Sequence, residues 1–337
     1  MSKMQAAFIT KYGSAEKLVF GDFDIPKLGD TDVLVEIYSA SLNPIDFKIR
    51  DGKIKFLRRY SFPLIMGHDL AGVVSAVGSK VTRFKKGDKV YSRPRNGRTG
   101  SLAQYIAVDE NELSLMPKNL SYSEAASVPL VGLTSWQALL DIAGMKPGDR
   151  VFIQAGSGGI GTFAIQLAKH FGAYVMTTTS TRNVDFVRGL GADEIIDYKK
   201  QKFEEALRDV DIIFDTLGGE ALYKSFEVIR PGGSIVSISG DPDQRLAQDM
   251  NLSFIKGLVL RLVGRKVNSL ARKARASYRF IFMKPSGEQL AHIARLIENG
   301  DIKPIIDKEF SFAESQQAMD YLESGHARGK VVIKIRE

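Results

Sequence analysis

The run RVFIQAGSGGIG constrains the fold of this chain more than any other stretch. Residues 151–154 read as a short buried strand, and residues 160–171 read as the helix that follows it. Between them, Gly156, Gly158 and Gly161 have the spacing G-x-G-x-x-G. The first glycine of this pattern permits a tight turn, the second lets the backbone approach a pyrophosphate, and the third lets the helix pack closely on the strand. Because the helix N-terminus also offers unpaired N–H groups, the run predicts a dinucleotide-binding unit.

Short apolar strands and helices alternate after this run. The alternation predicts a parallel sheet with helices on both faces, an α/β doubly wound (Rossmann) fold over residues 122–283. A ligand of such a sheet binds at the carboxyl ends of the strands. The expected strands are 174–178, 194–197, 211–215, 234–239 and 278–283, the expected helices are 183–190, 203–207 and 220–229, and a turn is expected at 231–233.

The residues on either side of this unit have a different pattern. Before residue 121, short strands are separated by Gly-Asp and Gly-Ser turns, which is typical of an antiparallel, barrel-like domain. The last expected strand, residues 330–335, needs a sheet to join, so we expect the C-terminal segment to return to the N-terminal barrel. We therefore predict a discontinuous domain of residues 1–121 and 284–337, with the nucleotide-binding domain as an insertion.

Composition narrows the class of protein. The chain of 337 residues contains no cysteine, which excludes disulfides, thiolate catalysis and cysteine-ligated metal sites. No stretch approaches the roughly 20 apolar residues that span a bilayer. The N-terminus has no long apolar core, so we expect no signal peptide and a cytoplasmic protein.

Basic residues give the chain a formal net charge of +8 and concentrate at 48–59 and 256–279. The second segment mixes apolar and cationic residues at roughly helical spacing. One interpretation is a contact with RNA or with a membrane surface. The other is a solvated helix whose Lys and Arg stems cover apolar surface. No RNA- or DNA-binding module accompanies the segment, so we favour the solvated helix and expect no nucleic-acid partner.

Several motifs along the chain occur in the order typical of one dehydrogenase family. With the glycine run, they make the chain resemble the medium-chain dehydrogenase/reductase superfamily, specifically its zinc-independent quinone oxidoreductase and enone reductase branch. The resemblance implies a Rossmann cofactor domain inserted into a GroES-like, mostly β catalytic domain, usually in a homodimer. The motifs are SLNPIDFK at 41–48, GHDLAGVVSAVG at 67–78, KGDKVY at 86–91, GSLAQYIAV at 100–108, AASVPLVGLTSWQAL at 125–139, GADEIIDY at 191–198 and GKVVI at 329–333.

Zinc-dependent relatives in this superfamily hold a catalytic metal with a cysteine, the histidine of a GHE motif and a further cysteine or acid. Here Asn43 stands at the position of the cysteine, and His68 lies in GHD. A catalytic zinc needs three protein ligands plus water, and a single histidine beside an aspartate is a poor set. We therefore expect no metal. The alternative within enzymes is a zinc-type alcohol dehydrogenase, which metal analysis distinguishes.

The end of the second strand of the nucleotide fold sets the choice of cofactor. NAD-preferring folds place a carboxylate there, which accepts a hydrogen bond from the ribose 2′-OH. Here the strand continues through Thr179, Ser180 and Arg182, and no carboxylate appears before Asp185. Hydroxyl groups and a guanidinium bind a 2′-phosphate, whereas a carboxylate repels it, so the expected cofactor is NADPH. The resemblance to NADPH-dependent reductases implies that Tyr198 packs against the same phosphate.

A bound nicotinamide supplies the hydride, so the protein must position it and stabilise the charge that develops on the substrate. When the hydride reaches the β-carbon of an enone or alkenal, negative charge grows on the carbonyl oxygen. Lys48 is the expected cation at that oxygen, because enone-reducing relatives carry a lysine at the matching position. The alternative is that Lys48 is only part of the solvated basic run. Asn43 is an expected amide donor to ribose or substrate, and Asp46 is a candidate for orienting Lys48, although residues i and i+2 do not face each other on a helix.

The leading hypothesis is thus an NADPH-dependent, zinc-free reductase of activated C=C bonds or quinones, acting on a small electrophile. From another class, the chain could be a binding protein that contacts RNA or membrane through residues 256–279. The remaining expected cofactor contacts lie in the glycine loop, at strand ends, at a helix start (Thr134) or in the tail (Lys330). They are Thr134, Gly156, Ser157, Gly158, Gly159, Ile160, Gly161, Thr216, Leu217, Ser239, Gly240, Phe282, Met283 and Lys330.

Overall fold

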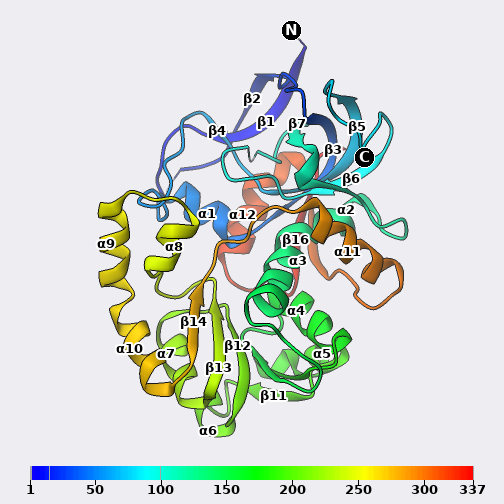
Figure 1. Cartoon of the computed structure of the whole chain (residues 1–337). Coiled ribbons are helices and arrows are strands. Elements are labelled where there is room, and N and C mark those ends of the chain that lie inside the picture. The colour runs from blue at the N-terminus through cyan, green and yellow to red at the C-terminus, as the bar shows by residue number, and fades with distance from the viewer. Residues whose placement is uncertain (1, 15, 99, 337) are drawn as a thin grey trace. The chain divides into compact units, whose positions relative to one another are not determined.

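The computed structural model describes residues 2–14, 16–98 and 100–336. The chain divides into two compact units (Figure 1). Unit 1 contains Met1–Leu133 and Lys284–Glu337, and unit 2 contains Thr134–Met283. A mostly β, GroES-like unit interrupted by a Rossmann-like unit with a parallel sheet confirms the predicted fold class.

The first division between the units lies after Leu133 rather than after residue 121 as predicted. The reason is helix α2 (Tyr122–Ala126), which packs against strands β3 (Asp32–Leu42) and β5 (Asp69–Val77) of unit 1. The second division lies at Met283 and Lys284.

Unit 1 holds two sheets. The larger has the order β15-β16-β3-β5-β6-β8, with β7 also paired to β3, and the smaller has the order β2-β1-β4. Nearly all pairs are antiparallel, as the short strands and Gly-containing turns predict, and β15–β16 is parallel. The strands besides β3 and β5 are β1 (Lys3–Ile9), β2 (Val19–Asp24), β4 (Leu64–Ile65), β6 (Lys89–Ser92), β7 (Tyr105–Asp109), β8 (Leu113–Leu115), β15 (Ile306–Ser311) and β16 (Lys330–Lys334).

The C-terminal strand returns to the N-terminal sheet, which confirms that expectation. β16 pairs antiparallel with β3, with Val331 opposite Leu42 and Val332 opposite Ser41. This register sets Lys330, the first residue of β16, beside the end of β3 and the start of the next helix. Val331 and Ile333 are completely buried in the core of unit 1, which anchors the register.

Short helices follow the strands of unit 1. Helix α1 (Pro44–Arg50) begins directly after β3, with a proline at its first position, where no N–H is needed. The others are α11 (Gly287–Glu298), α12 (Ser315–Glu323), the short 3₁₀ segments η1 (Glu110–Glu112) and η4 (Phe312–Glu314), and α3 (Pro129–Trp136), within which the division between the units falls.

Unit 2 is a six-stranded parallel sheet with the order β11-β10-β9-β12-β13-β14. The glycine run follows β9 in the middle of the sheet, where the strand order reverses, which is where doubly wound sheets bind ligands. Phe152 and Phe214 are completely buried, as expected for strands with helices on both faces. The strands are β9 (Arg150–Ile153), β10 (Tyr174–Thr179), β11 (Glu194–Asp197), β12 (Val210–Asp215), β13 (Ile229–Ser237) and β14 (Ser277–Phe280).

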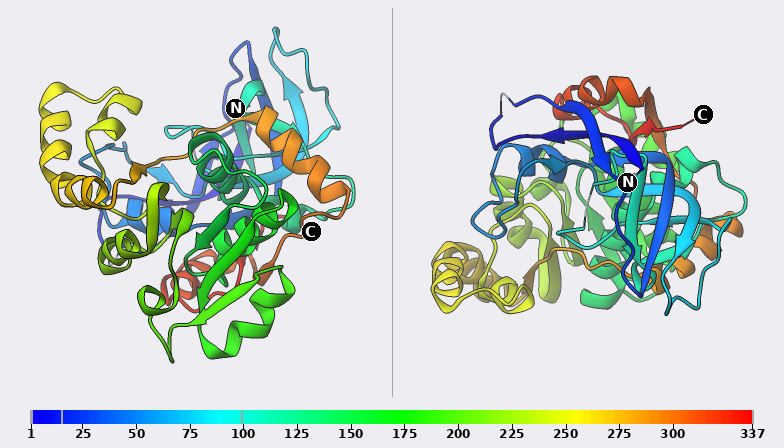
Figure 2. Two further views of the ribbon diagram at one scale, coloured as in Figure 1. Left: turned by 60° about the horizontal axis from the view of Figure 1, so that its bottom comes forward. Right: turned by 90° about the horizontal axis from the view of Figure 1, so that it is seen from above.

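Helices connect these strands. α4 packs against β9 and β10, and α7 packs against β12 and β13 (Figure 2). The expected turn at 231–233 is instead a bulge inside β13, because the register to β12 jumps from Ile229 to Ser234. The helical segments are η2 (Gln137–Ile142), α4 (Gly159–His170), η3 (Thr181–Asn183), α5 (Val184–Gly189), α6 (Phe203–Ala206), α7 (Gly219–Val228), α8 (Gln244–Asp249), α9 (Phe254–Val263) and α10 (Arg265–Ala274).

Candidate active site

The glycine run forms the turn between β9 and α4. A side chain at Gly161 would place its Cβ 2.4 Å from the carbonyl oxygen of Ala155, so the helix approaches the turn as closely as a glycine permits. A Cβ at Gly156 would lie 2.2 Å from Thr177 Oγ1. Gly158, by contrast, has space around it, with its nearest neighbour at 3.4 Å, which leaves room for a ligand to approach the backbone. The left-handed residue of the turn is Ala155, with φ of +52°, and not the first glycine.

Ser157 ties this loop to the end of β10. Its hydroxyl accepts hydrogen bonds from Thr179 Oγ1 at 3.2 Å and from Asn183 Nδ2 at 3.1 Å. The Thr179 side chain is 1% exposed, so its hydroxyl supports the loop from inside and is not presented to solvent. Asn183 is a supporting residue that the sequence analysis missed, although its place one residue after Arg182 brings it to the same loop.

The segment after β10 carries the residues expected to select the cofactor. Arg182 is exposed on η3 and Ser180 is half-buried. The Tyr198 backbone N–H donates to the Thr179 carbonyl at 3.1 Å, which brings the exposed Tyr198 ring to this strand end. The neighbouring carboxylate, Asp197, accepts from Thr181 Oγ1 at 2.6 Å, and this bond holds the pKa of Asp197 below its ordinary value.

The carboxyl ends of β12 and β13 are joined by hydrogen bonds around Asp215. Its carboxylate accepts from the Gly218 backbone N–H at 2.8 Å and from the Ser237 hydroxyl, and burial raises the pKa of Asp215. Ser237 Oγ also accepts from the Gly240 N–H at 2.7 Å. A Cβ at Gly218, where φ is +71°, would lie 2.1 Å from the Ser239 carbonyl oxygen. The two expected contact segments, 216–217 and 239–240, therefore lie side by side.

In unit 1, four donors converge on the buried carboxylate of Asp69. Oδ2 accepts from Ser41 Oγ at 2.9 Å, from Asn43 Nδ2 at 2.9 Å and from Lys330 Nζ at 3.2 Å. Oδ1 accepts from the Leu130 backbone N–H at 2.8 Å. We call Ser41, Asn43, Asp69 and Lys330 the Asp69 cluster. The sequence analysis did not name Ser41, and it considered Asp69 only as the aspartate beside His68 in a metal-ligand set.

Lys330 supplies the cation of the Asp69 cluster. Besides Asp69, its Nζ donates to the Leu42 carbonyl at 3.2 Å and to Asn43 Oδ1 at 2.5 Å. All three N–H groups of the ammonium are thus used inside unit 1. Burial lowers the pKa of Lys330, and the charge of Asp69 opposes that shift. The ammonium therefore has no further donor to offer a cofactor in this arrangement, and the expected contact of Lys330 with the cofactor remains a prediction.

Asn43 and Asp46 have partners that the sequence analysis did not expect. The Asn43 amide is 2% exposed; its Nδ2 donates to Asp69 and its Oδ1 accepts from Lys330 within the cluster. Asp46 Oδ2 accepts from the Asn43 backbone N–H at 2.8 Å, which closes the first turn of α1. Asp46 Oδ1 lies 2.7 Å from His68 Nδ1. Asp46 therefore orients the His68 ring, and the proposed contact with Lys48 is replaced by this one.

Three buried nitrogen atoms of unit 1 have no hydrogen-bond partner within the described ranges of the chain: His68 Nε2, Arg93 Nε and Arg336 Nε. Because His68 Nδ1 faces a carboxylate, Nδ1 carries the proton in the neutral ring and Nε2 is left as an acceptor. Burial lowers the pKa of Arg93. An unsatisfied buried polar atom costs about 1–3 kcal/mol, so His68 Nε2 and Arg93 Nε are atoms that a bound ligand can satisfy.

Lys48 lies on α1 and is half-buried. Burial lowers the pKa of its ammonium, and the positive charge of Lys53 lowers it further. Over the part of the chain that the structure describes, Lys48 has no ion-pair partner, whereas Lys53 lies 2.9 Å from Asp51 Oδ2. A partly desolvated cation without a counter-ion is what a site that stabilises a developing oxyanion requires.

One expected contact occupies a different place in its helix. Thr134 lies inside α3 rather than at its first residue and is 3% exposed. Leu217 is well exposed. Phe282 and Met283 are the last two residues of unit 2.

A Rossmann unit inserted between two segments of a GroES-like unit is the architecture of medium-chain dehydrogenases and reductases. The sequence matches the family described as alcohol dehydrogenase GroES-like domain over residues 29–118, and the family described as zinc-binding dehydrogenase over residues 190–333.

Three known proteins are similar to this chain over nearly its whole length. The mitochondrial NAD(P)H oxidoreductase RTN4IP1 of Danio rerio is 35% identical, covering 99% of this chain and 92% of its own. The 2-methylene-furan-3-one reductase of Solanum lycopersicum is 37% identical, covering 98% of this chain and 79% of its own. The solved quinone oxidoreductase of Coxiella burnetii has a TM-score of 0.85 at 32% identity, covering 99% of this chain and 100% of its own. The chain belongs to the medium-chain dehydrogenase/reductase superfamily, in its quinone oxidoreductase and enone reductase branch, and is an oxidoreductase.

The family description that mentions zinc calls for a test of the donor set. Of the expected ligand positions, His68 retains a free Nε2, but the Asn43 amide and the Asp69 carboxylate are engaged with the Lys330 ammonium. No group of three His, Asp or Glu side chains among the described residues is placed to hold a metal ion. A catalytic zinc needs three such ligands, so this donor set does not fit one.

No helix within the described residues is long and apolar enough to cross a bilayer. The cytoplasmic location and the homodimer expected from the sequence remain predictions.

Proposed function

We propose that the protein is an NADPH-dependent, zinc-free reductase that delivers hydride to the activated C=C bond of enones and alkenals or to quinones. The observation that carries this proposal is the half-buried Lys48 ammonium, which has no counter-ion among the described residues and whose pKa is lowered by burial. The names of the similar proteins from Solanum lycopersicum and Coxiella burnetii support the same substrate classes.

When bound, the nicotinamide supplies the hydride. The Lys48 ammonium stabilises the negative charge that grows on the substrate oxygen, and its partial burial strengthens that interaction. Lys330 and Asp69 hold Asn43 and the end of β3 in place, and Asn43 is the residue from which α1, and with it Lys48, begins. Asp46 fixes the His68 ring, whose Nε2 is available to accept a hydrogen bond from a ligand.

NADPH is proposed as the cofactor because of the residues that follow β10. Ser180 and the exposed Arg182 offer a hydroxyl and a guanidinium to a 2′-phosphate, and Tyr198 lies at the same strand end. The nearby Asp197 carboxylate accepts hydrogen bonds from Thr181 Oγ1 and, at 3.0 Å, from the Lys199 backbone N–H. These donors partly offset its negative charge and so weaken its repulsion of a phosphate. Gly158 leaves space for the pyrophosphate at the start of α4.

Replacement of Arg182 tests the cofactor proposal. We expect Arg182→Ala to weaken NADPH binding by about 10- to 100-fold, because a charge-assisted hydrogen bond contributes about 1.5–3 kcal/mol. NADH has no 2′-phosphate, so its affinity should stay unchanged. Isothermal titration calorimetry with both cofactors measures the difference.

Arg188→Ala is the matched control for this variant. Arg188 is also an exposed arginine, six residues further along in the next helix, α5, and its guanidinium pairs with Asp185 at 2.6 Å. It should leave both affinities at the wild-type level. Equal affinity of the wild-type protein for NADH and NADPH would contradict the proposed preference.

Oxidation of NADPH and NADH across a panel of quinones, enones and alkenals tests the whole proposal, with metal content measured on the same sample. We expect turnover of electrophiles without stoichiometric zinc, and no loss of activity with a chelator, because the donor set cannot hold the metal. Recovery of a lost activity on adding zinc would overturn this part of the proposal and favour a zinc-type alcohol dehydrogenase.

A further inference from the structure

We propose that α9 and α10, residues 254–275, form a docking surface for an anionic lipid membrane. This surface lies entirely within unit 2, and the proposal does not depend on which electrophile the enzyme reduces. The sequence analysis favoured a solvated helix for this segment. The exposed side chains of α9 and the charges around them argue for a membrane partner instead.

Most of the surface of α9 is apolar and exposed. Phe254 is 86% exposed, Ile255 is 74% exposed and Leu262 is 55% exposed. Leu258, Val259 and Val263 are exposed as well. At about 100° per residue, these six side chains cover one continuous arc of about 180°. A contiguous apolar face of this kind on a protein surface marks an interaction site.

Basic side chains border this apolar arc. At the same spacing of about 100° per residue, the arc runs from Phe254 to Val263 around the helix. Arg261 lies about 20° outside the Phe254 edge, and Lys256 lies about 20° outside the Val263 edge. Long cationic side chains at these positions can keep their charges at headgroup level while the apolar arc enters the lipid. An apolar face flanked by Lys and Arg is typical of helices that lie in a membrane interface.

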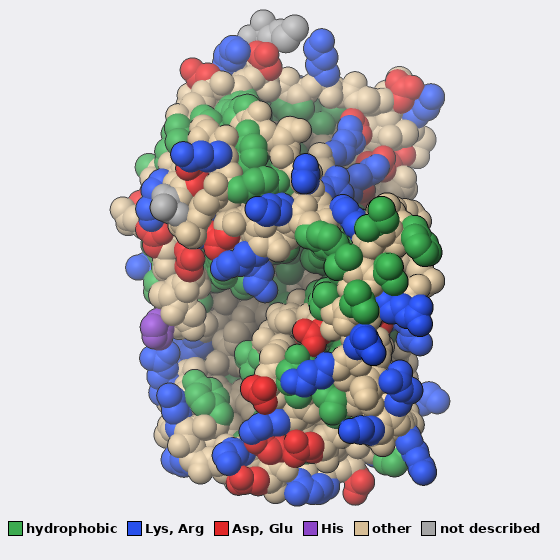
Figure 3. Space-filling model, turned by 90° about the vertical axis from the view of Figure 1, so that its left-hand side faces the viewer, with side chains coloured by type: hydrophobic (Ala, Val, Ile, Leu, Met, Phe, Trp, Pro, Cys, Tyr) green, Lys and Arg blue, Asp and Glu red, His purple; other side chains and the backbone are tan. Residues whose placement is uncertain are grey.

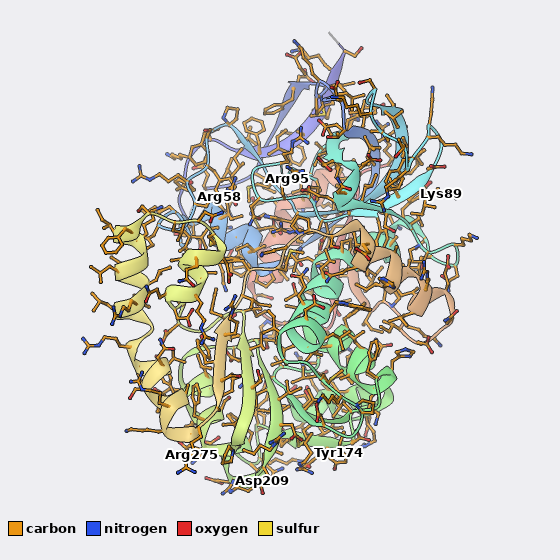
Figure 4. All side chains as sticks on the ribbon, viewed as in Figure 1. Arg58, Lys89, Arg95, Tyr174, Asp209 and Arg275 are labelled. Carbon is orange, nitrogen blue, oxygen red and sulfur yellow. The ribbon has the colours of Figure 1, made fainter. Side chains whose placement is uncertain are left out.

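The whole segment carries charge of one sign. Residues 254–275, FIKGLVLRLVGRKVNSLARKAR, contain seven basic residues and no acidic one. Hydrophobic side chains gather on this side of the molecule, with Lys and Arg side chains beside them (Figure 3). Arg275 lies where α10 ends (Figure 4). The basic residues are Lys256, Arg261, Arg265, Lys266, Arg272, Lys273 and Arg275.

The fold does not need the exposed face of α9. Gly257 and Leu260 are the buried residues of α9, on the side where the helix packs on α8. Val267 and Ala271 are the buried residues of α10, which packs on α7 and β14. Lys266 Nζ lies 3.4 Å from the centre of the Tyr223 ring on α7, which adds a further attachment. The helix pair is therefore held from one side and presents its apolar arc outward.

The positive charge of residues 254–275 distinguishes between the possible binding partners of this surface. A second copy of the chain bound through a two-fold axis would bring the same seven cations against themselves, and like charges across an interface are costly. Nucleic acid would satisfy the cations but leave the six apolar side chains against phosphate and water. An anionic membrane surface matches both features, because its headgroups attract the cations and its acyl chains receive the apolar arc.

Vesicle flotation tests the proposal on the full-length protein. We expect binding to vesicles of phosphatidylcholine with phosphatidylglycerol and little binding to phosphatidylcholine alone. Raising the salt from about 0.1 M to about 1 M shortens the screening length from about 10 Å to about 3 Å and should reduce the binding. Phe254→Ser/Ile255→Ser and Arg261→Glu/Arg265→Glu should each lower the partition coefficient by about tenfold or more.

Two variants elsewhere serve as matched controls. Leu115→Ser removes an apolar side chain that is 53% exposed on β8, and Lys86→Glu reverses an exposed charge in unit 1. Both should leave vesicle binding unchanged, and all variants should reduce a water-dissolved quinone at the wild-type rate. Failure to bind anionic vesicles would overturn the proposal. So would a dimer that dissociates in Phe254→Ser/Ile255→Ser, or binding to nucleic acid with none to vesicles.

Discussion

Lys48→Met is expected to lower kcat for an enone by about 100-fold, with a smaller change in KM. The reason is that an ammonium aimed at a developing enolate acts mainly in the transition state, where the charge on oxygen is largest. NADPH affinity should remain near the wild-type value, because the glycine loop belongs to unit 2 and Lys48 to unit 1. Stopped-flow and steady-state measurements with NADPH and a simple enone give kcat, KM and cofactor affinity separately. Undiminished enone turnover would show that Lys48 is only part of the solvated basic run.

The same variant should separate the two substrate classes. Quinones accept hydride more readily and need less stabilisation at oxygen, so their kcat should fall less than that of enones. Lys53→Met is the matched control, because Lys53 is an exposed lysine close to Lys48 in the chain and pairs with Asp51. Lys53→Met should leave the maximal kcat, reached at a pH where Lys48 is fully protonated, unchanged.

The pH dependence of the activity distinguishes a role of the Lys48 ammonium from a loss of folding. Lys48 acts as the protonated ammonium, so activity should fall as the pH rises through its pKa, which burial holds below the usual lysine value of about 10.4. Lys53 lowers that pKa further by repulsion. Removing the Lys53 charge should therefore move the alkaline limb of the profile to higher pH. A limb that does not move in Lys53→Met would argue against Lys48 as the titrating group.

The fold could be predicted from the sequence because its signals are local. Apolar strands, the glycine spacing and the lone C-terminal strand each reflect backbone requirements within a few residues, and β9, α4 and β16 lie within a residue or two of where they were expected. Strands β2, β4 and β8 were not expected from the sequence; β4, for instance, has two residues, too few to show a periodic pattern. The unit boundary was displaced because the packing of α2 on β3 is a tertiary contact that no local pattern reveals.

The candidate site was harder to predict because its main residues come from distant parts of the chain. The Lys330 side chain meets Asp69 from 261 positions away, a contact that depends on the register of β16 against β3. Lys330 and Asn43 were identified as functional candidates, but the sequence could not show that each would satisfy the other. Asp46 lies two residues from Lys48 in the chain, yet its carboxylate turns to His68.

Lys330→Met is expected to destabilise unit 1 by about 3–5 kcal/mol, the range for removing one partner of a buried ion pair. Its Nζ lies 3.2 Å from Asp69 Oδ2, and the two side chains are 5% and 0% exposed. Without the ammonium, the Asp69 carboxylate stays buried with only neutral donors. Urea unfolding followed by circular dichroism, with hydrogen exchange of the β3 and β16 amides, measures the loss and shows whether it occurs in unit 1.

Two comparisons separate the ion pair from a general effect of losing a lysine. Lys334→Met removes a lysine from the same strand whose pair with Glu309, at 2.6 Å, is solvent-exposed, so it should cost no more than about 1 kcal/mol. Lys330→Met/Asp69→Asn removes both charges and should be more stable than Lys330→Met alone, because no uncompensated charge remains buried. If the double variant is as unstable as the sum of the single variants, the cost comes from lost packing, and the Lys330 ammonium does not act as the counter-ion of Asp69.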